Sequence, residues 1–452
     1  MGGLGFGGLY FGRRTERTMN PIRAYGWLEI GASILAIASL LLLELTGYLY
    51  VESGGTAELG PAGATAWRLA LAVLAIGPCA FAMGGNLPYA VKYLQRNKDA
   101  RRRGTAVLYA LNALGAVAGT LATTFWFLEH MGSTMTVILA SLINGCIGAV
   151  ALGLARRSRR LAPIETTVTE TAEVGNEPPQ GLQSRSLLVI VALCCSFLSG
   201  FLFFTMEAVW LRMLIPLMGG SVYVPGAMLT VVLFGITMGG LLYSARASAK
   251  LPTLNELAIV LGLFGLALAV PWALGDRLAV LAYHLNQLRG FGFWAQIAVW
   301  HVIAAFVCLI PSLVAGYQFP LFVGLLGTGS DSVGRHLGFV YAVNTLGAIF
   351  GSLASGLWLL PSLGALSLWR VGIFAVSGMC VAAAVLSWIC RRHRDERNGR
   401  SALAASCCLI VVIFAMALPT MTEGPTAIWR HMPIGYGGRI KGIPNAPADL
   451  TN

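Results

Sequence analysis

Charged residues are scarce in this sequence, and their scarcity decides the class of protein. Lysine, arginine, aspartate and glutamate together make up 11% of the 452 residues, and hydrophobic residues make up 56%. Soluble globular domains carry roughly 25% charged residues. Because so apolar a chain has too few charges to be solvated by water, we predict that it lies in a lipid bilayer.

Acidic residues are rarer than basic ones, so the formal net charge is +12. The basic residues lie in short clusters between long apolar runs, for example at 101–103 and 156–160. Clusters of this kind are typical of cytoplasmic loops under the positive-inside rule. We therefore attribute the basic charge to membrane topology and predict no nucleic-acid partner.

The sequence also lacks the patterns of metal and cofactor sites. The nine cysteines never show CxxC spacing, and the six histidines never pair four residues apart, so no metal site is predicted. Gly3, Gly5 and Gly8 match the pattern GxGxxG, but no strand precedes them and no acidic residue follows in a βαβ context. We reject the dinucleotide interpretation and predict no cofactor.

Long apolar runs fill most of the chain. A helix needs about 20 apolar residues to cross a hydrocarbon core about 30 Å thick. We predict an all-α, polytopic transmembrane helix bundle of about eleven full spans, with residues 1–12 forming a partial helix at the N-terminus. The predicted spans are 25–47, 67–91, 105–128, 133–155, 186–216, 222–245, 254–274, 294–323, 336–360, 366–390 and 402–420.

One long polar interval, residues 156–185, separates two halves of the chain. Its threonine, glutamate and proline residues make it too polar to bury, and we predict a flexible cytoplasmic linker. The predicted organisation is a first transmembrane repeat at 1–155, the linker at 156–185, a second repeat at 186–390, a basic loop and final span at 391–420, and a polar tail at 421–452.

An internal repeat relates the two halves. YALNALGAVAG in the first half matches YAVNTLGAIFG in the second. The matches extend without a gap at a constant separation of 232 residues (344 − 112 for the two asparagines), here called the repeat offset. The same offset places Gly8 on Gly240, so we expect the first repeat to lack a counterpart of residues 186–232 and to be truncated. The matched pairs are Pro88 and Pro320, Arg103 and Arg335, Tyr109 and Tyr341, Asn112 and Asn344, Gly115 and Gly347, Gly119 and Gly351, and Gly132 and Gly364.

Loop charge predicts the orientation in the membrane. Residues 92–103 carry six basic residues against one aspartate, whereas the loop of Glu52 and Glu58 carries acids and no base. An even number of spans per repeat then makes the repeats parallel, related by an axis along the membrane normal. The loops predicted to be cytoplasmic are 92–104, 156–185, 246–250 and 391–400.

A lone acidic residue marks a candidate intramembrane site. Glu207 lies deep in an apolar span, with Trp210 and Arg212 following it. A carboxylate at the centre of a membrane helix costs about 2.5–3.5 kcal/mol even on the smallest scales. Glu207 is therefore interpreted either as a solute or proton site with Arg212 as its counter-charge, or as part of a structural ion pair. Both interpretations predict a polar partner within hydrogen-bond reach.

The repeated motif supplies further candidates. Asn112 and Asn344 are each followed by glycine three and seven residues later, a row that lets another helix approach closely. We interpret the two amides either as helix-packing groups or as a symmetric pair lining a central cavity. Tyr109 and Tyr341 precede them in the same motif and belong to the same candidate site.

Prolines at matched positions predict two broken helices. Such breaks would free backbone carbonyls and indicate a binding site, although proline kinks also occur in membrane helices without one. The prolines are Pro78, Pro88, Pro311 and Pro320, and the polar side chains beside the expected breaks are Asn86 and Gln318.

Three segments together resemble a known family. SGFLFFTMEAVWLRML, GGSVYVPGAMLTVVLFGITMGG and the twice-used YAxNxLGAxxG resemble the membrane region of the fused spermidine synthase-like proteins of bacteria. These proteins join a major facilitator-like module to a synthase domain, and the resemblance covers nearly all of residues 1–440. It implies a multi-pass protein of the bacterial inner membrane, with Glu207, Trp210 and Arg212 matching the family's first-span motif.

The resemblance leaves three functions open. The first is transport or sensing of a small cationic solute, and the second is a scaffold for a separately encoded synthase domain. The third is polyamine synthesis, which needs a Rossmann-like aminopropyltransferase domain. Neither its GGGxG loop nor its paired aspartates follow the last span here, so enzyme activity is left undecided. The partners implied are the bilayer, a cationic solute and a separate synthase domain.

Overall fold

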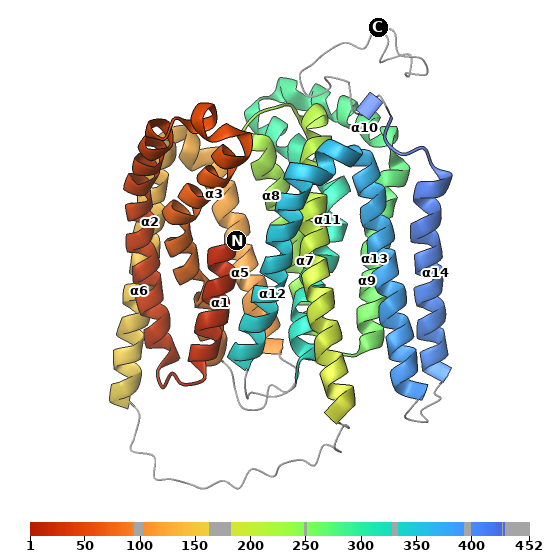
Figure 1. Cartoon of the computed structure of the whole chain (residues 1–452), viewed down its shortest axis with the longest axis horizontal. Helices are drawn as coiled ribbons and strands as arrows, with labels where there is room; N and C mark the ends of the chain where they lie inside the picture. The colour runs from red at the N-terminus through yellow and green to blue at the C-terminus, as the bar shows by residue number, and fades with distance from the viewer. Residues whose placement is uncertain are drawn as a thin grey trace. The chain divides into compact units, whose positions relative to one another are not determined.

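A computed structural model describes residues 1–94, 103–161, 182–247, 251–327, 333–392, 399–426 and 428–429. Across these residues all regular secondary structure is helical, which confirms the predicted all-α class (Figure 1). Most of the loop at 92–104 and of the linker at 156–185 lies outside the described residues, so the predicted cytoplasmic placement of both stays a prediction.

Eight helical stretches in the described part of the chain are long and apolar enough to cross a membrane. Two of them, Gly104–Arg157 and Gly334–Ile389, contain 54 and 56 residues. At 1.5 Å per residue each would measure about 80 Å, far more than a hydrocarbon core of about 30 Å. Gly132 and Gly364 interrupt them with φ of 72° and 73°, values that favour glycine. The chain is thus a multi-pass membrane protein, and the count of eleven spans stays a prediction.

The helices group into two compact units, and the first contains Met1–Ala100, Phe127–Ile190 and Gly329–Leu346. In this unit α2 lies along α6, where Gly26 meets the carbonyl of Gly148 (Figure 1). At about 21 Å, α1 is too short to cross a membrane alone, as its sequence predicts. The helices are α1 (Gly2–Thr15), α2 (Pro21–Glu52), α3 (Gly55–Gly84), α4 (Asn86–Leu94), α6 (Leu128–Leu161) and the start of α12 (Val333–Ala354).

The second unit contains Arg101–Trp126, Val191–Thr328 and Gly347–Asn452. Four fully buried tryptophans lie in it, at 210, 272, 369 and 429, and the rings of Trp272 and Trp429 each meet Trp369 edge-on. Its helices are α5 (Arg103–Ala122), most of α7 (Leu182–Met218), α8 (Tyr223–Ala247), α9 (Leu254–Leu274), α10 (Asp276–Asn286), α11 (Phe293–Leu325), the end of α12, α13 (Leu360–Arg392) and α14 (Gly399–Met421).

One close glycine contact in unit 1 recurs in unit 2 at the repeat offset. In unit 1 a Cβ on Gly7 would strike the carbonyl of Phe81, and in unit 2 a Cβ on Gly239 would strike the carbonyl of Leu313. Such contacts let two helices approach until only a glycine fits between them. The two π-helical turns, Thr123–Phe127 and Ser355–Leu359, are related by the same offset.

The tyrosines of the repeated motif pack in the same way in both units. Tyr341 lies against Gly8 in unit 1, and Tyr109 lies against Gly240 in unit 2. Each unit therefore combines helices from one half of the sequence with a motif-bearing helix from the other half. Two repeats that make the same helix contacts would exchange their motif-bearing helices in this way.

The segment after α14 is not only a polar tail. Thr426 donates to Asp276 through its backbone N–H at 2.9 Å and also through its hydroxyl. Trp429 donates its indole N–H to the carbonyl of Met213 at 2.6 Å. Thr426 is thus fastened to the start of α10 and Trp429 to α7, while residues 427 and 430–452 lie outside the described residues.

Candidate intramembrane polar site

Glu207 lies on α7 in unit 2, within an apolar span, as predicted from the sequence. Its side chain is half-buried. The carboxylate lies within electrostatic range of the Cys308 thiol on α11. Among the residues that the structure describes, no hydrogen bond or ion pair is made to this carboxylate, so the polar partner expected from the sequence is not found.

Arg212 does not serve as the counter-charge of Glu207. Its side chain is exposed and forms no ion pair with Glu207, although both residues are described. The reason is geometric, because residues five apart on an α-helix do not share a face. Trp210 is fully buried and meets Phe203 edge-on at 5.9 Å between ring centroids, and its indole N–H has no hydrogen-bond partner in the described part of the chain.

The two asparagines of the repeated motif have different surroundings. Asn112 on α5 is exposed, whereas Asn344 on α12 is half-buried and has an interaction partner. The ring of Tyr109 stacks on Phe319 of α11 at 4.7 Å between centroids. Asn112 and Tyr109 belong to unit 2, while Asn344 and Tyr341 belong to unit 1, so their symmetric arrangement stays a prediction.

Asn86 is part of a polar cluster in unit 1. It lies just after Gly85, which separates α3 from α4, and its amide donates to Oε1 of Glu29 on α2 at 2.9 Å. The Tyr25 hydroxyl, one turn before Glu29 on α2, also interacts with this carboxylate. Only 6% of Glu29 is exposed, so the amide and the hydroxyl solvate a carboxylate that is nearly buried.

The helix breaks predicted from proline occur in only one of the two copies. In the first copy α3 ends at Gly84 and α4 begins at Asn86, shortly before Pro88, while Pro78 lies inside α3. In the second copy α11 is continuous through Pro311 and Pro320, so the predicted break beside Gln318 is wrong. Tyr317 stands where the first copy has Gly85, and its hydroxyl anchors α11 to α9.

Gln318 is buried within the continuous helix. Only 2% of it is exposed, and its Nε2 has no hydrogen-bond partner among the described residues. An unsatisfied buried amide costs about 1–3 kcal/mol. Gln318 therefore remains a candidate polar group, although no freed backbone carbonyl accompanies it.

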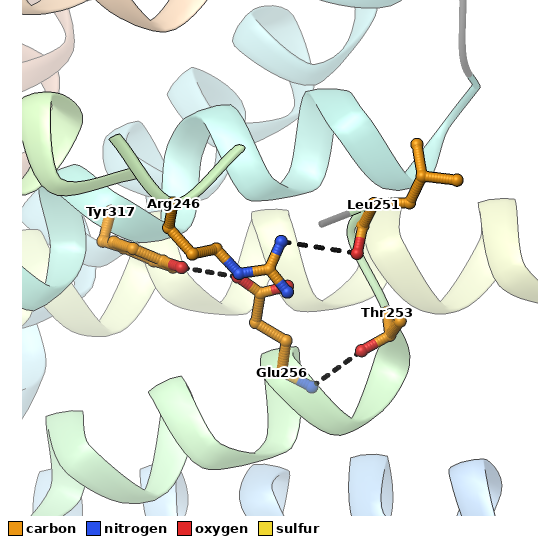
Figure 2. Close-up of polar contacts among 5 residues, drawn as sticks. All are labelled: Arg246, Leu251, Thr253, Glu256 and Tyr317. Atoms are coloured by element: carbon orange, nitrogen blue, oxygen red, sulfur yellow. Dashed lines mark hydrogen bonds and ion pairs between the residues drawn. The ribbon is translucent and has the colours of Figure 1, made fainter. Parts of the chain in front are cut away.

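A third polar cluster lies where α8, α9 and α11 meet in unit 2 (Figure 2). Arg246 at the end of α8 forms an ion pair with Glu256, which also accepts a hydrogen bond from the Tyr317 hydroxyl at 2.5 Å. Arg246 donates to the carbonyl of Leu251 at 3.3 Å, and the Thr253 hydroxyl caps α9 by accepting from the Glu256 N–H. Every charge in this cluster is matched, as expected of a structural tie between helices.

Among the described residues, the carboxylates of Glu29, Glu207 and Glu256 are buried or half-buried in apolar spans, and their surroundings differ. Glu29 accepts a hydrogen bond from an amide and interacts with a hydroxyl, and Glu256 has a cation and a hydroxyl. Glu207 has none of these among the described residues. Reasoning from sequence identified Glu207 but missed Glu29 and Glu256, although each is a lone acid in an apolar run and carries the same signal.

No protein-family model and no curated protein sequence matches the chain.

Proposed function

We propose that this protein binds a small cationic solute within the membrane and moves it across, and that Glu207 supplies the binding charge. The observation that carries the proposal is the contrast among the three carboxylates. Glu29 and Glu256 are held by protein donors, whereas Glu207 has no such donor in the described part of the chain. An acidic group in a membrane span is rare, and one left unpaired usually marks a solute or proton pathway.

The repeated contacts support a transporter-like architecture for this activity. Glycine contacts and tyrosine contacts recur at the repeat offset, and we infer from them two parallel repeats in one membrane. Membrane transporters often place binding groups where such repeats meet. The basic loops support a cytoplasmic position for the linker, and the resemblance to spermidine synthase-like proteins of bacteria supports the inner membrane as the location.

Proteoliposomes containing the purified protein test the proposal. We expect uptake of radiolabelled spermidine, or of its shorter relative putrescine, above the level of empty liposomes. Glu207→Gln keeps the shape of the side chain and removes its charge, so it should lower uptake by at least about tenfold while the protein still inserts and folds. Glu52→Gln is the matched control, because Glu52 is an exposed acid at the end of α2, outside the predicted span 25–47, and should be dispensable.

The resemblance to spermidine synthase-like proteins provides the second candidate, a membrane anchor for a separately encoded synthase domain. No contact among the described residues favours it. If neither polyamine is taken up and Glu207→Gln changes only stability, Glu207 is a structural residue and the transport proposal fails. Capture of a purified aminopropyltransferase by the reconstituted protein would then support the anchor function.

A further inference from the structure

Two glycines on α5 lie open, while their counterparts on α12 are covered. A Cβ built on Gly115 or Gly119 would meet nothing within 4 Å. A Cβ built on Gly347 or Gly351, their partners in the repeat, would strike α7 at the carbonyls of Phe197 and Phe201. The two glycine pairs lie in the same motif, YAxNxLGAxxG, but only the second pair is packed against another helix.

The covered pair, Gly347 and Gly351, shows what kind of helix surface packs against this motif. On α7 the two aromatic residues lie one turn apart, and their backbone carbonyls rest directly on the two glycines of α12. One turn further along α7, the Thr205 hydroxyl donates to the carbonyl of Gly351 at 3.3 Å. Close backbone contact over small residues, reinforced by a hydroxyl, is a recurrent way in which membrane helices associate.

The open face of α5 carries a polar group as well as glycines. Asn112 lies one turn before Gly115 and is exposed, and no partner for its amide is found among the described residues. Asn344, its counterpart on α12, is half-buried and has a partner. An amide facing hydrocarbon without a hydrogen-bond partner is costly, so the open face would be stabilised by a helix that covers it.

The early spans are less covered than the later ones. In Pro21–Glu52, Gly55–Leu94 and Gly104–Arg157, 17% of the most apolar 18 residues are buried. In the later spans the corresponding share lies between 44% and 67%, and for the α7 span it is 50%. The low burial is thus confined to the spans of the first half of the sequence, which contains the open pair Gly115 and Gly119.

We propose that the face of α5 formed by Asn112, Gly115 and Gly119, here called the α5 groove, docks a transmembrane helix that is not among residues 1–452. The partner has the surface of α7: two aromatic residues one turn apart whose carbonyls rest on the glycines, followed one turn later by a hydroxyl aimed at the carbonyl of Gly119. This surface is the one that the second copy of the motif already holds.

Binding of a synthetic peptide to the full-length protein in nanodiscs tests the proposal. The probe is a fluorescent peptide with the sequence of residues 188–218, which reproduces α7, and a scrambled peptide of the same composition controls for partition into lipid. We expect saturable binding of the α7 peptide only. Gly115→Leu and Gly119→Leu fill the groove and should weaken binding by at least about tenfold, since a leucine side chain prevents backbone contact.

A matched variant separates groove filling from general damage. Gly153→Leu on α6 adds the same side chain at a glycine that is also open, and it should change binding by less than about twofold. Gly115→Leu should not lower the thermal stability of the protein, because a Cβ at this position meets no neighbour and leucine favours the helix more than glycine does. Equal binding of the α7 and scrambled peptides, or equal binding by all three variants, would overturn the proposal. Self-association of the protein that Gly115→Leu abolishes would overturn it too, since the groove would then hold a second copy.

Discussion

Adding one methyl group at Gly351 should destabilise the protein, whereas adding it at Gly119 should not. A Cβ at Gly351 would lie 2.9 Å from both Cα and C of Phe201 and closer still to its carbonyl oxygen, all of them backbone atoms of α7. Overpacking of this kind costs typically about 1–3 kcal/mol. Replacing glycine by alanine stabilises a helix by up to about 1 kcal/mol, and this gain applies at both positions. The difference in unfolding free energy between Gly351→Ala and Gly119→Ala therefore measures the cost of the steric clash alone.

Thermal unfolding in detergent, followed with a thiol-reactive dye, measures this difference. Cys308 and Cys380 are fully buried and become reactive only when unit 2 opens. We expect Gly351→Ala to unfold several degrees below Gly119→Ala, since 1 kcal/mol shifts the midpoint by about 2–4 °C in proteins of 150–250 residues and by less in larger ones. Equal midpoints, or a higher midpoint for Gly351→Ala, would refute the helix contact between α7 and α12.

Three further substitutions test the polar contacts. Asn86→Ala removes the amide donor of the buried Glu29 and should lower the free energy of unfolding by about 1.5–3 kcal/mol, measured by the same thermal assay; an unchanged midpoint would show that the carboxylate does not need this donor. Tyr317→Phe removes one hydrogen bond to Glu256 but leaves the ion pair of this carboxylate with Arg246, so it should cost only about 0.5–1.5 kcal/mol, and a loss as large as that of Asn86→Ala would contradict the geometry. Trp429→Ala should cost about 3–5 kcal/mol and make the segment after α14 sensitive to limited proteolysis, whereas a protease-resistant variant would show that the indole does not fasten this segment.

The all-α, multi-pass class could be predicted from composition and length alone. Apolar runs of 20 or more residues have only two stable solutions in a bilayer, helices and closed barrels, and the runs here are too long and too continuous for strands. The glycine and tyrosine positions of the repeat were also visible in the sequence, because glycine is required where two helix backbones touch. The recurring contacts of Gly8 and Gly240 with tyrosine agree with that reading.

The surroundings of individual polar residues could not be predicted in the same way. Asn86 and Gln318 occupy matched positions beside matched prolines, yet only the first lies at a helix break. The deciding residue is the one before each: Gly85 leaves the first helix free to end, whereas Tyr317 fastens the second to Glu256 through its hydroxyl. That contact joins residues 61 positions apart, so no local sequence pattern predicts it.

The glycine pairs show why a motif alone does not determine its environment. Gly115 and Gly347 share the pattern YAxNxLGAxxG and the same helical geometry, and both are followed by a π-helical turn. One nevertheless faces open space and the other touches a backbone carbonyl, because burial depends on whether a neighbouring helix is present. A glycine that touches nothing costs up to about 1 kcal/mol of helix stability relative to alanine. Both copies nevertheless keep the glycines of the motif, although only the second copy has a neighbouring helix. This argues that a helix also packs against the open glycines of the first copy.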